Sequence, residues 1–108
     1  MPQQHYEYRP TEEVWTFREL MHHIAYGIHW WEEQFVKGKE TAWDPPPVKK
    51  DRAAVLTYLK GAFDSLEKTV KGGKRDGVHA TLDHVTHHRG AATIYLRAKG
   101  ITPPEYQY

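Results

Sequence analysis

Apolar side chains recur at spacings of three and four along three stretches of the chain, which is the period of a helix with one buried face. These stretches cover residues 17–35, 55–70 and 78–96. No stretch alternates apolar and polar side chains with period two, so no strand is predicted. The pattern therefore predicts an all-α chain with three long helices.

The predicted core positions are the apolar members of these three stretches. They are Phe17, Leu20, Met21, Ile24, Ile28, Trp31 and Phe35, then Val55, Leu59, Ala62, Phe63, Leu66 and Val70, then Val78, Leu82, Val85, Ala92 and Leu96. Thr11 is expected to cap the first helix, because the two glutamates that follow it would then lie in the first turn. Gly38 is expected to end that helix, and Asp51 is expected to cap the second.

Helices of this length that are joined by loops form an antiparallel bundle, so consecutive helices are expected to alternate up and down. The 108 residues are expected to form a single domain, residues 1–108. Trp43 lies in the proline-rich loop of residues 38–50 and is expected to pack onto the bundle. Three helices with many aromatic residues can leave an apolar face open, which favours a homodimer.

Composition removes several classes of function. The chain has no cysteine, so any tightly held metal must use imidazole, carboxylate or water as ligands. A net charge of +1 argues against nucleic acid and membrane surfaces as partners, although residues 71–75 (KGGKR) form a basic turn. No apolar run approaches the ~20 residues of a membrane span. The polar N-terminus does not resemble a signal peptide, so a cytoplasmic protein is expected.

The eight histidines carry the candidate chemistry. His84 and His88 are four residues apart, so on a helix they project from one face and can bind the same metal ion. His22 and His23 lie in the middle of the first helix, which antiparallel packing could bring opposite this pair. Either one would complete a three-histidine site with open positions for water or substrate. Periodicity does not choose between them.

Several neighbouring residues are candidates for supporting roles. His87, Asp83 and Tyr95 are the residues to test as catalytic groups, although for Tyr95 a place in the core is favoured over a hydrogen bond to a metal-bound ligand. Asp83 and Glu19 are candidate carboxylate partners of the ligand imidazoles. Gly90 would let another helix approach closely.

Three segments together resemble the DinB/YfiT-like family of helical-bundle metal proteins. They are EVWTFRELMHHIAYGIHWW (13–31), DHVTHHRG (83–90) and YLRAKGITPPEYQY (95–108). The resemblance implies a bundle whose divalent metal is bound by three histidines, and these fall on His23, His84 and His88. It therefore favours His23 over His22. Zinc or nickel is the metal expected at such a site.

The sequence departs from the family pattern in three places. Ala91 stands where the family usually has glutamine, the turn at Gly72–Gly73 is shorter, and only ten residues precede Thr11 where members have a first helix. A shortened bundle is therefore expected, either completed by dimerisation or representing a reduced or engineered version of the fold. The resemblance implies a metal-dependent thiol transferase or hydrolase acting on a small molecule. The alternative is a non-catalytic helical dimer or scaffold with a vestigial metal site.

Overall fold

The computed structural model describes residues 1–73 and 75–105. Its main elements are α1 (Phe17–Trp31), α2 (Arg52–Lys71) and α3 (Val78–Ala98). A short 3-10 turn, η1 (Gln3–His5), precedes them, and a π-helical turn, η2 (Glu32–Val36), continues α1. The described residues include no strand, so the prediction of an all-α chain with three long helices is confirmed. Lys74 in the basic turn and residues 106–108 of the aromatic tail lie outside the described residues.

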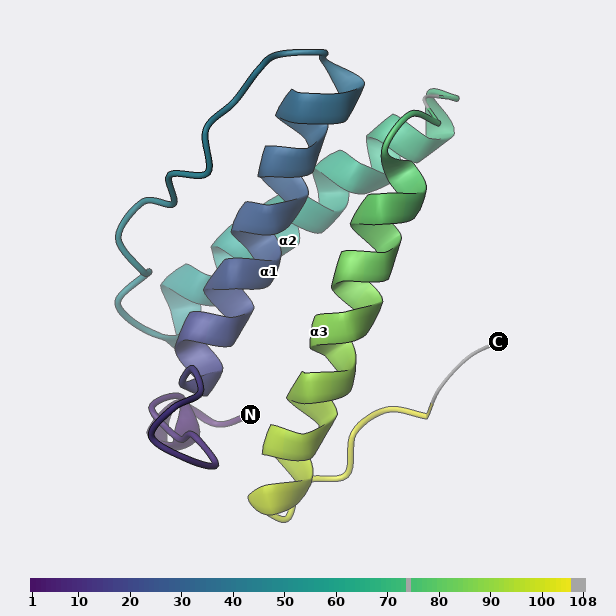
Figure 1. The fold of residues 1–108 in the computed structure, drawn as a ribbon. Helices are drawn as coiled ribbons and strands as arrows, with labels where there is room; N and C mark the ends of the chain where they lie inside the picture. The colour runs from purple at the N-terminus through teal and green to yellow at the C-terminus, as the bar shows by residue number, and fades with distance from the viewer. Residues whose placement is uncertain (74, 106–108) are drawn as a thin grey trace.

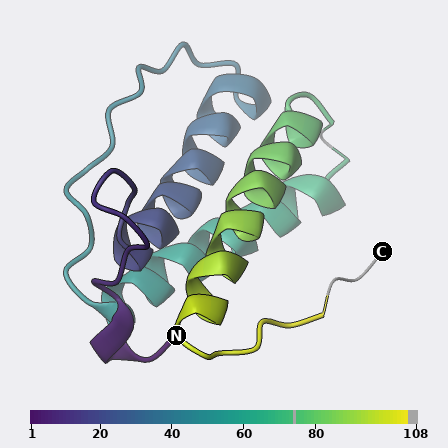
Figure 2. The same cartoon turned by 60° about the horizontal axis from the view of Figure 1, so that its bottom comes forward.

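The helix α1 packs against both α2 and α3. Figure 1 shows α1 and α2 running upward, with α2 crossing behind, while α3 returns downward beside α1. This order differs from the expected alternation of up and down. The proline-rich loop passes along the outside of α1 and carries the chain back to the end where α1 began (Figure 2). Residues 37–51 reach up to ~50 Å when extended, about twice the ~22 Å rise of the 15-residue α1.

The start of α1 also differs from the prediction, because Thr16 rather than Thr11 caps it. Glu19 N donates to Thr16 Oγ1 at 3.1 Å, and Thr16 N donates to Glu19 Oε2 at 2.7 Å. This reciprocal pair is a capping box, and its sequence signature, Thr-x-x-Glu, was available at residues 16–19. The backbone N–H groups of Phe17 and Arg18 donate to carbonyls of the N-terminal segment. That segment therefore folds back on the end of α1 instead of extending the helix.

The cap gives a first testable prediction. Thr16→Ala is expected to lower the free energy of unfolding by about 1 kcal/mol, because it removes the side chain that accepts an otherwise unpaired helix N–H. Thr11→Ala is the matched control and is expected to change it by less than about 0.5 kcal/mol, since Thr11 is exposed. Urea unfolding of both variants measures the difference. Equal losses in the two variants would contradict this assignment of the cap.

The core forms where the other elements meet α1. Its buried apolar residues are Tyr6, Phe17, Leu20, Met21, Ile24, Ala25, Ile28, Val55, Ala62, Leu66 and Tyr95. Four predicted core residues, Phe35, Phe63, Val70 and Leu82, are instead 40–44% exposed. The helices α2 and α3 each pack on α1, which lies between them. Their outer faces are therefore left uncovered. In the described part of the chain, no helix has both the length and the apolar character needed to cross a membrane.

Candidate metal centre

Three histidines converge where the middle of α1 faces the middle of α3. His23 Nε2 lies 3.1 Å from His84 Nε2 and 3.0 Å from His88 Nε2. Each of the three residues offers one ring nitrogen, and these nitrogens all lie within 4.8 Å of one another. His84 and His88 are one helical turn apart on α3, and each places its Nε2 close to that of the single histidine from α1. The predicted convergence is confirmed, with His23 as its member from α1.

The spacing of the nitrogens fits a metal ion better than it fits hydrogen bonding. An imidazole nitrogen has one hydrogen or one lone pair in the ring plane, so His23 Nε2 can make one good hydrogen bond at a time. It nevertheless faces two other Nε2 atoms at nearly equal distances. Nitrogens bound tetrahedrally to zinc at ~2.05 Å lie about 3.3 Å apart, close to the spacing seen here. These three residues could therefore hold a divalent ion with small adjustments.

A glycine on α1 makes room for the third imidazole. Gly27 lies one turn after His23, and the His84 ring packs directly on its Cα. A Cβ at this position would collide with His84 Cε1 and would lie 3.0 Å from Nδ1. Gly90, which was predicted to permit a close helix approach, is exposed and a Cβ there would meet nothing within 4 Å. The close contact between α1 and α3 therefore depends on Gly27.

Burial keeps the three imidazoles in the form that binds metal. Burial, and secondarily the neighbouring His88 and His84, lowers the pKa of His23 to about 4. Burial also lowers the pKa of His88 to about 4, with smaller contributions from His84 and His87. The pKa of His84 is also lowered, by burial first and then by the neighbouring His87. All three rings are thus neutral near pH 7, and neutral imidazole is the ligand form.

These depressed pKa values predict how the stability of the metal-free protein depends on pH. The unfolded chain, with histidine pKa values near 6.5, binds more protons than the folded chain between about pH 6.5 and pH 4. The stability contributed by the neutral rings is therefore expected to be complete above pH 6.5 and to be lost as the pH falls toward 4. Urea midpoints measured across this range test the effect. His88→Ala should flatten the profile and His79→Ala should not, and identical profiles for all three proteins would contradict the prediction.

Two tryptophans flank the triad. The Trp15 ring lies 4.3 Å from the His23 ring, and the Trp43 ring lies 5.5 Å from it on the side of the loop. Trp43 thus packs onto the bundle as predicted, although it is 46% exposed. Tyr95 is buried, and its hydroxyl donates to the Trp15 carbonyl at 2.6 Å. Tyr95 therefore positions the backbone of Trp15, and its pKa is raised by burial and then by Glu19.

The other predicted supporting residues do not contact the ligand nitrogens. His87 is exposed and meets only the outer side of the triad, with its ring 4.9 Å from that of His88. Asp83 is exposed, and the Glu19 side chain serves the cap of α1. His84 Nδ1 is buried with no hydrogen-bond partner in the described chain. A metal at this triad would therefore lack the carboxylate partners that usually orient its imidazoles.

His22 points away from the triad and toward α2. It is buried, and its Nδ1 accepts a hydrogen bond from the Lys49 backbone at 3.4 Å. Its ring packs on Tyr58 with 5.1 Å between the centroids. The two adjacent histidines thus have separate roles, which the helical periodicity alone could not assign.

Two cavities adjoin the triad, and Trp15 lines both. The first, of about 230 Å³, is called here the Trp43 pocket; it is lined by Trp15, Glu19, His22, His23, Tyr26, Trp43, Pro45, Pro46 and Val48. The second, of about 290 Å³, lies beside His88 and is lined in part by Ala91 and Tyr95. A longer side chain at Ala91 would enter this second space. The triad therefore has a cavity on the side of His23 and another on the side of His88.

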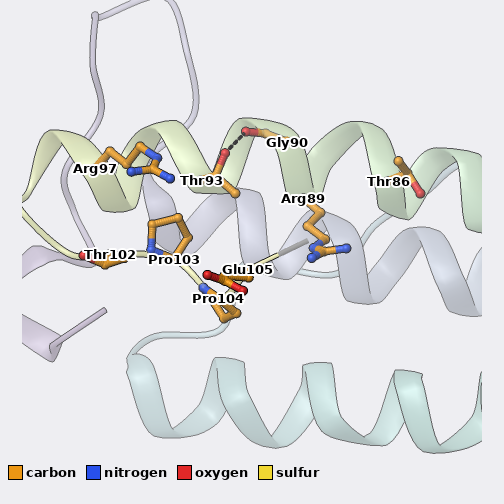
Figure 3. Close-up of a pocket in the computed structure, with 9 residues that line it drawn as sticks. All are labelled: Thr86, Arg89, Gly90, Thr93, Arg97, Thr102, Pro103, Pro104 and Glu105. Carbon is orange, nitrogen blue, oxygen red and sulfur yellow. Dashed lines mark hydrogen bonds between the residues drawn. The ribbon is translucent and has the colours of Figure 1, made fainter. Parts of the chain in front are cut away.

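A further cavity, of about 610 Å³, lies on a different face of α3, between that helix and residues 102–105. Figure 3 shows Pro104 and Glu105 opposite Arg89, with Thr93 donating to the Gly90 carbonyl. None of the three clustered histidines lines it. Its size therefore does not make it the candidate active site, because the convergent donor atoms are elsewhere.

Sequence reasoning missed Trp15 and Gly27 as parts of the centre. Gly27 had a readable signal, since a residue four positions after His23 shares its helix face. Trp15 had none, because its position depends on the fold of the N-terminal segment. Comparison with protein-family models and with curated proteins finds no match for this chain. The function is therefore inferred from the geometry of the triad and from the motifs within the sequence.

Proposed function

We propose that this protein is a metal-dependent enzyme in which His23, His84 and His88 hold one divalent ion, zinc or nickel. The proposed reaction class is thiol transfer or hydrolysis on a small molecule, as the sequence resemblance to DinB/YfiT-like proteins implies. The observation that carries the proposal is the contact of His23 Nε2 with two other Nε2 atoms at 3.0 and 3.1 Å. The group comprises three imidazoles and no fourth ligand from the described residues, which is typical of catalytic rather than structural sites.

The chain itself would supply orientation and exclusion of water. When bound, such an ion supplies Lewis acidity, which lowers the pKa of a coordinated thiol or water. Trp15 covers one face of His23, and Tyr95 holds the Trp15 backbone in place. Gly27 lets the His84 ring reach the other two rings. The His87 ring lies 4.9 Å from that of His88, and His87 is the residue to test in proton transfer.

Loading the protein with Co²⁺ tests whether a metal at the triad has open coordination positions. A site with open positions is expected to change its visible bands when 2-mercaptoethanol is added and to gain a thiolate-to-cobalt charge-transfer band in the near ultraviolet. The Cys-free chain supplies no such band by itself. An open site would be contradicted if the visible bands of the cobalt-loaded protein stayed the same after 2-mercaptoethanol is added and after the pH is changed. Failure to bind cobalt would favour the alternative of a scaffold with a vestigial site.

We also propose that two copies associate through the outer face of α2. Leu56, Phe63 and Val70 recur every seven residues there and are 38–42% exposed. Lys60 and Glu67 flank this stripe on one side, about 50° from its line. Antiparallel pairing about a two-fold axis at Phe63 would place Lys60 beside the partner's Glu67. The stripe would then pair with its own copy through apolar residues along its centre and opposite charges along its edge.

Sedimentation velocity at several concentrations tests this association. The wild type is expected to be a dimer and Phe63→Asp a monomer, because the charge would be buried at the centre of the interface. Ile94→Asp, on the exposed side of α3, is the matched control and is expected to stay dimeric. A monomeric wild type would contradict the proposal.

A further inference from the structure

The Trp43 pocket combines aromatic faces with a single formal charge. Trp15, Tyr26 and Trp43 provide its rings, and Glu19 is the only formally charged residue among the described residues that line it. At about 230 Å³, it is smaller than the ~300–1,000 Å³ usual for drug-sized ligands. It therefore suits a small group.

Two cations that neighbour lining residues in the sequence, Lys49 and Arg18, have partners outside the pocket. Lys49 follows the lining residue Val48, but its ammonium lies 5.0 Å from the centre of the Tyr58 ring. Arg18, adjacent to Glu19, pairs with Glu7 and donates to the Lys49 carbonyl at 2.9 Å. Neither side chain lines the pocket. The Glu19 carboxylate, which also accepts a hydrogen bond from Thr16 N, therefore supplies the formal charge of the described lining, while Arg18 interacts with it from outside the lining.

Three aromatic residues share the lining of this one small cavity, namely Trp15, Tyr26 and Trp43. A cation is attracted to an aromatic ring when it lies over the ring within ~6 Å of its centroid. Tyr26 meets Trp43 edge-on at 4.7 Å, and its hydroxyl accepts a hydrogen bond from Asp44 N at 2.8 Å. This contact anchors the loop that carries Trp43.

We infer that the Trp43 pocket binds the ammonium group of a small zwitterionic substrate whose anionic end, a thiolate or carboxylate, reaches the histidine triad. Aromatic rings with a nearby carboxylate are the chemistry that recognises substituted ammonium groups. The anionic end rests on the proposed function, because it requires the metal. An ammonium group alone would be repelled by a divalent ion, whereas a zwitterion brings its own neutralising charge. The ammonium subsite itself depends only on residues of the chain.

Binding of choline to the metal-free protein tests the subsite on its own. Choline is titrated into ¹⁵N-labelled protein at pH 7.5 while the tryptophan indole N–H signals are followed by NMR. The neutral isostere 3,3-dimethylbutan-1-ol is titrated in parallel, since it has the same shape without the charge. Choline is expected to bind at least about tenfold more tightly and to shift the Trp15 and Trp43 signals. Equal affinity for the two compounds, or no binding of choline, would overturn the inference.

Three variants locate the binding. Trp43→Leu is expected to weaken choline binding at least about fivefold, and the matched control Trp31→Leu, whose ring stacks on Phe35 outside the pocket, is expected to leave it unchanged. Glu19→Gln removes the charge but keeps a capping-box residue, so it should weaken choline while the helix remains. Choline binding that is indifferent to both pocket variants would also overturn the inference.

The failure of this inference can be told apart from failure of the proposed function. Choline binding without metal binding would leave the ammonium subsite standing and remove the catalytic ion. Metal binding without choline binding would leave the proposed function standing and remove the subsite. His88→Ala, which does not line the Trp43 pocket, is expected to retain choline binding while losing metal.

Discussion

Replacing His84 by alanine is expected to lower the affinity for zinc or nickel by more than about 100-fold. Loss of a partner that merely orients a ligand typically costs 10–100-fold, and here one of three ligands would be lost. His84 contributes one of the two short Nε2 contacts to His23. Competition with a chromophoric chelator measures the affinity, and unfolding of the metal-free protein checks that the fold remains.

His87→Ala is the matched control for this prediction. It removes an imidazole from the same turn of α3, but His87 is exposed and its ring lies on the outer side of His88. Its effect on metal affinity is expected to be less than about threefold. Equal losses of metal affinity in the two variants would mean that surface histidines bind the metal non-specifically. Unchanged affinity in His84→Ala would mean that the triad does not bind the metal.

Gly27→Ala is expected to weaken metal binding by more than about tenfold without touching any ligand. The added Cβ would overlap the His84 ring, so the ring must move away from the other two nitrogens. A metal site tolerates displacements of only about 0.5 Å before its geometry is lost. Circular dichroism is expected to show an intact helix, because alanine is the better helix former.

Gly61→Ala separates this steric effect from helix propensity. Gly61 lies on the exposed side of α2, and a Cβ there would meet nothing within 4 Å. The substitution is expected to raise the free energy of unfolding by about 0.5–1 kcal/mol and to leave metal binding unchanged. Wild-type metal affinity in Gly27→Ala would contradict the packing of His84 on α1.

The parts of the centre that follow from helical geometry were readable from the sequence. His84 and His88 lie one turn apart on any helix, and antiparallel packing of two long helices brings their midpoints together. The choice of His23 over His22 required the resemblance, because the two residues flank the apolar stripe on opposite sides. In the structure, one faces α3 and the other faces Tyr58 and the loop.

The parts that depend on tertiary packing were not readable. Thr16 rather than Thr11 caps α1 because the N-terminal segment folds against the helix end, and this fold also brings Trp15 onto His23. The direction of α2 depends on the path of the loop that precedes it. The prolines of this loop allow an extended path but do not determine where it leads. Phe63 and Leu82 match the helical period yet remain exposed, because periodicity shows which face is apolar and not whether a partner covers it.

The most direct test of the account is the metal content of the untagged protein. The protein is incubated with excess zinc, separated from free metal by gel filtration and measured by elemental analysis. The account predicts about one zinc per chain in the wild type and in His87→Ala, and none in the His84→Ala/His88→Ala double variant. A folded wild type that retains no metal, or a double variant that retains as much as the wild type, would contradict it.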